Sequence, residues 1–159
     1  MAAIAAMAGV SKALLHYHYS DRARLLAEVV MHLGERLAAR EHSAIDGSDG
    51  SKAVDALWRW MERELAQGEL RALLELSLIR EPLVHDAARA VAGARRRLAA
   101  RTTAEVMGRL QLVPRVPPEL LGEAGVAFVD GLALGDVVSA ADPRVAFDVF
   151  WLAMLGLAE

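Results

Sequence analysis

Few side chains in this sequence have the types and spacing that catalysis or metal binding requires. The chain has no cysteine, so neither a disulfide nor a thiolate ligand can form. His16 and His18 make an H-x-H pair, but residues i and i+2 of a helix point about 200° apart and do not readily hold one metal ion. There is no G-x-S-x-G, P-loop, H-E-x-x-H or dinucleotide-binding glycine motif. We therefore expect no catalytic residue, metal site, cofactor or enzyme activity.

A second group of side chains, near the N-terminus, is suited to phosphate and DNA bases. In the stretch AGVSKALLHYHY, Gly9 allows a tight turn between two short helices, Val10 can fill the space between them, and Ser11 can cap the second helix. Lys12 lies in the first turn, where a cation is poorly placed for the helix dipole, and a facing phosphate would explain it. The pattern is typical of a helix-turn-helix. An ordinary helical corner is the alternative.

The formal charge is uneven along the chain. The net charge is only −3, so the whole molecule is not an electrostatic nucleic-acid binder. Residues 1–24 carry three basic side chains and one acidic side chain, whereas residues 112–159 carry two basic and seven acidic ones. A basic start and an acidic end favour a protein whose start faces an anion, and chance surface charge explains them equally well.

The elements that would position these residues are helices, because the apolar periodicity is helical almost throughout. Asp21 and Ser51 are expected N-caps, Gly68 a break, and Asp142-Pro143 an N-cap with the first helical position. The third helix carries an expected apolar face of Leu26, Val29, Leu33 and Leu37. We expect helices over residues 3–8, 12–18, 22–44, 52–66, 69–79, 83–112, 119–140 and 143–158.

Two arginine-rich stretches of the long helix 83–112 are interpreted as solvated surface. Arg101, Glu105 and Arg109 form an i, i+4 ladder. The three consecutive arginines 95–97 fan around the helix, so a solvated face is favoured over a phosphate-binding patch.

Residues 4–26, IAAMAGVSKALLHYHYSDRARLL, resemble the DNA-binding region of the TetR/AcrR family of one-component regulators. The family pattern, roughly IA..AGVS.gtlY.hF.sKe.Ll, overlays them without a gap. AGVS falls on the turn, Leu15 on the core leucine, Tyr19 on the usual Phe and Arg22 on the usual Lys. His16 replaces a common aromatic, and Leu14 a small or hydroxyl residue. The resemblance implies an all-α fold, with a helix-turn-helix over residues 1–24 and a linking helix into a ligand-binding and dimerisation domain over residues 25–159.

The resemblance also implies which residues touch operator DNA. Ser11, Lys12, Tyr17 and Arg22 would hold phosphates, and Ala13, Leu14 and His16 would approach bases. Family members begin with another helix, usually after a basic arm, whereas only three residues precede Ile4. We expect either a repressor that is truncated or has a mis-assigned start, or a natural variant whose helix-turn-helix binds DNA weakly. As written, the chain is expected to bind DNA weakly or not at all.

A small-molecule ligand is expected among the middle helices, although plain core packing also explains Trp58 and Met61. The expected lining residues are Trp58, Met61, Leu65, Leu74, Ser77, Met107 and Phe128.

A homodimer is expected through the last two helices. Residues 145–157, VAFDVFWLAMLGL, are apolar on every side except at Asp148, and such a helix must be buried on every side. The alternative is that these helices form the centre of a monomer. The expected interface residues are Ala127, Gly131, Leu134, Gly135, Val138, Phe147, Phe150, Trp151 and Met154.

These expectations combine into a ligand-responsive transcriptional regulator, a repressor that binds operator DNA as a dimer and is released by a small apolar ligand. The alternative is a helical dimeric module that binds a small molecule or a protein and does not bind DNA. The start MAAIAAMAGV lacks the basic region of a signal peptide, and no apolar run is long enough for a bilayer. A cytoplasmic location with no membrane partner is therefore expected.

Overall fold

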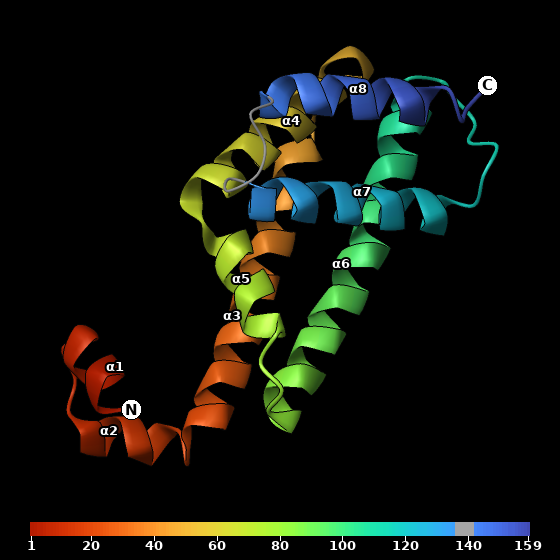
Figure 1. Cartoon of the computed structure of the whole chain (residues 1–159). Helices are drawn as coiled ribbons and strands as arrows, with labels where there is room; N and C mark the ends of the chain where they lie inside the picture. Colours follow the sequence, from red (N-terminus) through yellow and green to blue (C-terminus); the bar gives the residue numbers. More distant parts are fainter. Residues whose placement is uncertain (136–141) are drawn as a thin grey trace.

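All regular secondary structure in the described part of the chain is helical. The structure is a computed structural model that describes residues 1–135 and 142–159. The predicted all-α fold is confirmed for these residues (Figure 1). The helices are α1 Ala2–Met7, α2 Lys12–His18, α3 Arg22–Ile45, α4 Gly50–Gln67, α5 Glu69–Ser77, α6 Pro82–Arg109, α7 Pro118–Leu134 and α8 Pro143–Leu155.

Local capping explains why most helix starts were predicted correctly. Asp21 accepts a hydrogen bond from the backbone N–H of Arg24 at 2.8 Å, and Asp142 accepts one from Arg144 at 2.8 Å. Gly68, at φ 73°, separates α4 from α5. The prediction that Ser51 caps α4 is wrong, because that helix begins at Gly50 after Asp49. α6 and α8 end about three residues before their predicted ends, and the predicted end of α7, residue 140, lies outside the described residues.

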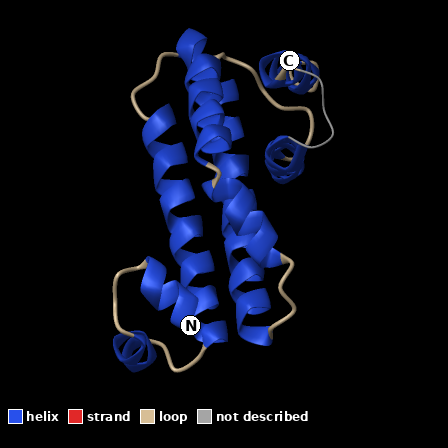
Figure 2. Ribbon diagram, turned by 60° about the vertical axis from the view of Figure 1, so that its left-hand side comes forward, coloured by secondary structure: helices blue, strands red, loops and turns tan. Residues whose placement is uncertain are grey.

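The two longest helices, α3 and α6, form the centre of the body. In Figure 1 both run along the length of the molecule, and α6 packs against α3 on one side and α7 on the other. α4 and α5 cover the α3–α6 pair. α7 and α8 run in opposite directions and, in Figure 2, are seen nearly end-on at one side of the molecule. They therefore form a two-helix layer of their own.

The chain has two apolar cores, one in the N-terminal head and one in the body. The head core consists of buried Ala5, Leu15 and Leu25, with Met1, Ile4 and Tyr19 packed against them. The body core begins with Leu26 and Val30 and extends through every helix from α3 to α8. The boundary between the two cores therefore falls inside α3, between two consecutive leucines.

Close contact between α6 and α7 depends on Gly122. A Cβ atom at this position would lie 2.5 Å from the backbone nitrogen of Ala100 and 2.7 Å from its Cα atom. Real Cβ atoms do not approach backbone this closely, so no other residue fits without separating the helices.

Two arginines expected on solvated faces of α6 instead tie helices together. Arg109 donates to the carbonyl oxygens of Ile45, at 2.6 Å, and Ser48, at 2.8 Å, and also pairs with Glu105. Arg95 is only 10% exposed and forms two hydrogen bonds with Asp130 of α7. The solvated-face prediction is wrong for these two side chains, because it considered α6 without its neighbours.

Candidate functional site

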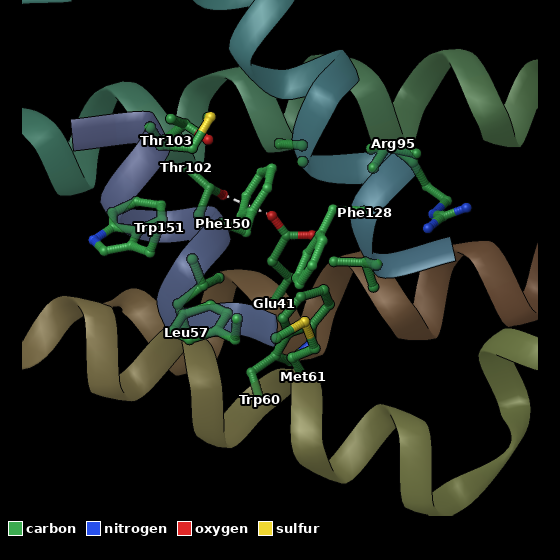
Figure 3. Close-up of a pocket in the computed structure, with 16 residues that line it drawn as sticks. Glu41, Leu57, Trp60, Met61, Arg95, Thr102, Thr103, Phe128, Phe150 and Trp151 are labelled. Atoms are coloured by element: carbon green, nitrogen blue, oxygen red, sulfur yellow. Dashed lines mark hydrogen bonds between the residues drawn. The ribbon is translucent and has the colours of Figure 1, made fainter. Parts of the chain in front are cut away.

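An apolar cavity lies in the body, between α3, α4, α6, α7 and α8 (Figure 3). The centre of a water-sized sphere can occupy about 60 Å³ of this cavity. A mostly apolar and aromatic lining with a few polar groups is typical of small-molecule sites. Its lining residues are Glu41 from α3; Leu57, Trp60 and Met61 from α4; Arg95, Ala99, Thr102 and Thr103 from α6; Gly125, Val126, Phe128 and Val129 from α7; and Phe147, Phe150, Trp151 and Met154 from α8.

Glu41 is the chemically distinctive residue of this cavity. Its side chain is buried, at 7% exposed, and the hydroxyl of Thr102 donates to its Oε1 atom at 2.8 Å (Figure 3). Burial raises the pKa of Glu41, because a charged carboxylate loses its water, and Thr102, Arg95 and Arg101 offset this only in part. The cavity therefore holds a carboxyl group that takes up a proton more readily than an exposed one.

Sequence reasoning missed Glu41 because the expected apolar face of α3 ended at Leu37, one turn before it. Leu26, Leu33 and Leu37 of that face do pack in the body core. The buried residues of this helix include Val30, Gly34, Leu37, Glu41 and Ile45, spaced by three or four. Val29, expected on the buried face, is 36% exposed. A charged residue that falls on an apolar stripe is itself a signal, and extending the stripe by one turn would have revealed Glu41.

Aromatic side chains form much of the remaining wall. The rings of Phe128 and Phe150 stack with their centroids 4.2 Å apart, and Phe147 and Trp151 lie nearly parallel at 6.3 Å. The indole nitrogens of Trp60 and Trp151 are buried without a hydrogen-bond partner among the described residues. Two residues of the cavity wall thus carry indole donors that no described residue uses.

The structure places two of the seven expected pocket residues, Met61 and Phe128, in the cavity wall. Trp58 instead packs on Phe147, with the guanidinium of Arg144 5.3 Å from the centre of its ring. The other four lie outside the cavity. Met107 is fully buried in the core, Leu65 and Leu74 pack against the core, and Ser77 donates to the carbonyl of Leu74.

The head at the other end of α3 has the geometry of a turn between two short helices (Figure 1). Gly9 has φ +67°, and Ser11 caps α2 by accepting from the N–H of Leu14 at 3.0 Å. Leu15 is buried as expected, but Val10 is 36% exposed and does not fill the space between the helices. The seven side chains expected to touch DNA are all exposed: Ser11, Lys12, Ala13, Leu14, His16, Tyr17 and Arg22.

An apolar surface runs along the outer side of α7 and α8. Leu120 and Leu134 of α7 are 59% and 48% exposed, and Val145, Val149 and Leu152 of α8 are 57%, 63% and 67% exposed. The three residues of α8 are spaced by three or four, and Ala124, Ala127 and Gly131 bridge Leu120 and Leu134 at the same intervals, so each set lies on one side of its helix. We call these five side chains, together with Ala124, Ala127 and Gly131 between them, the outer α7–α8 face.

Only part of the expected dimer interface belongs to this outer face. Ala127, Gly131 and Leu134 lie on it, Gly135 is half-buried, and Val138 lies outside the described residues. The four expected residues of α8, which are Phe147, Phe150, Trp151 and Met154, line the cavity inside the body instead.

No family model, curated protein or solved structure matches this chain. The described helices include none that is both long and apolar enough to cross a membrane. The head, the cavity and the outer α7–α8 face are therefore the features that indicate function.

Proposed function

We propose that this chain is a ligand-responsive transcriptional regulator. Its head would bind operator DNA, its cavity would bind a small, largely apolar molecule, and its outer α7–α8 face would join two copies. Binding of the ligand would favour a conformation in which the two heads are wrongly spaced for the operator, which is a shift of population between two states.

The observation that carries this proposal is the continuity of α3. The helix begins at Arg22, directly after the head, and Glu41 on the same helix lines the cavity. Leu25, within its first turns, belongs to the head core. Any displacement of α3 at the cavity is therefore passed to the head along an unbroken helix.

The exposed residues of α2 support a role in binding DNA. Leu14 is 46% exposed and Tyr17 is 84% exposed, and Lys12 stands beside them. A short helix that presents a cation, a phenol and small apolar groups can reach phosphates and base edges of a major groove. The family resemblance of residues 4–26 points the same way.

Operator binding tests the proposal directly. Fluorescence anisotropy with DNA that flanks the gene would be measured for this chain and for a form extended by the in-frame residues encoded upstream of Met1. We expect the extended form to bind tightly, Lys12→Ala to weaken binding to all sequences and flatten the salt dependence, and His16→Ala to reduce sequence preference. Arg97→Ala, which removes the same charge from an exposed position on α6, should leave binding unchanged.

The result that would contradict the proposal is absence of DNA binding by both forms in low salt. A dimer that binds a ligand in the cavity but no DNA would favour the alternative, a helical binding module. An immediate in-frame stop codon upstream of Met1 would favour the same alternative.

A further inference from the structure

We propose that the cavity selects an apolar cation, an aromatic or lipophilic amine whose ammonium group pairs with the carboxylate of Glu41. This inference rests on the proposed function only in taking the cavity as the ligand site. It adds the chemical class of the ligand, which the sequence did not indicate.

The first argument is the charge balance of the cavity. Only two of its lining residues, Glu41 and Arg95, carry charge. Arg95 is already neutralised by its two hydrogen bonds with Asp130, and in Figure 3 its guanidinium points away from Glu41. Among the described residues Glu41 has no ion-pair partner, and a buried carboxylate without one is costly. A ligand cation supplies the missing charge.

The second argument is the free acceptor on Glu41. Thr102 occupies the Oε1 atom, and it is the only hydrogen-bond donor to Glu41 among the described residues. The Oε2 atom is thus available to accept from an ammonium group. Because Thr102 holds the other oxygen, the carboxylate is oriented before the ligand arrives, which lowers the entropy lost on binding.

The third argument is the wall around this carboxylate. Phe128, Phe150, Trp60 and Trp151 line the cavity together with Glu41. Aromatic rings attract a desolvated cation and can cover the apolar part of an amine. An anionic ligand meets the opposite situation, since the free charge in the cavity is negative. A neutral ligand gains the apolar contacts but leaves Glu41 unpaired.

Three probes of equal ring size separate these possibilities: 1-naphthylmethylamine, 1-naphthalenemethanol and 1-naphthoate. Calorimetric titration of the full chain at pH 8, without DNA, should show the amine binding at least about tenfold more tightly than the alcohol, and the carboxylate binding most weakly. In Glu41→Gln, which keeps the shape and an acceptor for Thr102, the affinities of amine and alcohol should differ by less than about twofold. Glu62→Gln, at an exposed position on α4, should keep the wild-type preference.

The pH dependence gives a second readout. The charged groups near Glu41 are Arg95 and Arg101 of α6 and Asp130 of α7, and the lining residues of α4 and α8 carry no charge. Amine affinity should fall on acidification as Glu41 takes up a proton, and Glu41→Gln should abolish this fall. Thr102→Val should keep the amine preference and move the fall to higher pH, because it removes a hydrogen bond that stabilises the charged form.

The proposal is overturned if amine and alcohol bind equally well to the wild-type chain, if the amine preference survives in Glu41→Gln, or if the amine does not bind at millimolar concentration. None of these measurements involves DNA. Loss of the amine preference with intact operator binding would therefore reject the ligand class alone, whereas amine selectivity without operator binding would reject the regulator.

Discussion

At the scale of single residues, the ion pair of Arg40 and Glu64 joins α3 to α4 through a buried carboxylate. Glu64 is 1% exposed, and Arg40 donates to its two oxygens at 2.6 and 2.7 Å while also pairing with Glu69 at 2.8 Å. Arg40→Met would leave the buried carboxylate without its partner and should lower the free energy of unfolding by about 3–5 kcal/mol, measured by urea denaturation.

A matched control for this substitution lies one turn earlier on α3. Arg36 pairs with Glu69 at 3.0 Å but is 51% exposed, so Arg36→Met should cost only about 0–1 kcal/mol. Equal losses in the two variants would show that the buried position of Glu64 does not govern the stability of this contact.

Glu41 should make stability depend on pH with an unusual sign. Burial raises its pKa in the folded chain, so the folded state binds this proton more tightly than the unfolded state. Stability contributed by this group is therefore lost as pH rises from the ordinary carboxyl range through the raised pKa. Glu41→Gln should have a melting temperature at or above the wild type at pH 8, and its relative advantage should shrink towards pH 4.5. An advantage that grows on acidification would contradict this.

Residues with local effects were predictable, and residues with long-range partners were not. Asp21, Gly9 and Ser11 act on backbone within three residues, so their caps and turns could be read from the sequence. Glu41 and Arg109 act on groups about sixty positions away. No sequence spacing connects such pairs, so the hydrogen bond from Thr102 to Glu41 could not be predicted, although the place of Glu41 on the apolar stripe of α3 was a signal.

At the scale of helices, two glycines of α7 should respond oppositely to the same substitution. Gly122→Ala would place a methyl group against the backbone of Ala100 and should destabilise the fold by about 1–3 kcal/mol. At Gly131 an added Cβ meets no described residue within 4 Å, its own helix backbone apart, so Gly131→Ala should gain about 1 kcal/mol from helix propensity in a single protomer. Thermal unfolding of both variants measures the difference. A loss at Gly131 that deepens with protein concentration would instead show that a second chain packs there.

The orientation of α8 shows where helix-level prediction stops. Because α8 is apolar on nearly every side, its sequence required burial of the whole helix and did not distinguish its two faces. Phe147 and Trp151 point into the body, whereas Val149 and Leu152 point outward. That choice depends on the shape of the space beside α6 and α7, which no local pattern encodes.

At the scale of the whole molecule, the outer α7–α8 face predicts a two-fold dimer. Leu152 is 67% exposed on this face, and Leu78, after α5, is 77% exposed away from it. If two copies meet through α7 and α8, Leu152→Glu should produce the 17.1 kDa monomer, and Leu78→Glu should leave the dimer intact. Light scattering coupled to size exclusion gives the masses. A wild-type monomer at micromolar concentration would reject the dimer.

Because α3 contributes residues to both the head core and the body core, it can act as a lever arm between them. Arg22 and Glu41 are separated along α3 by about 28 Å at 1.5 Å per residue. A tilt of about 5° pivoting at the cavity would move the head by about 2.5 Å, and two heads related by a two-fold axis would change their separation by up to about 5 Å. The rise of B-DNA is about 3.4 Å per base pair. At its maximum, this change in the separation of the two heads exceeds one base-pair step.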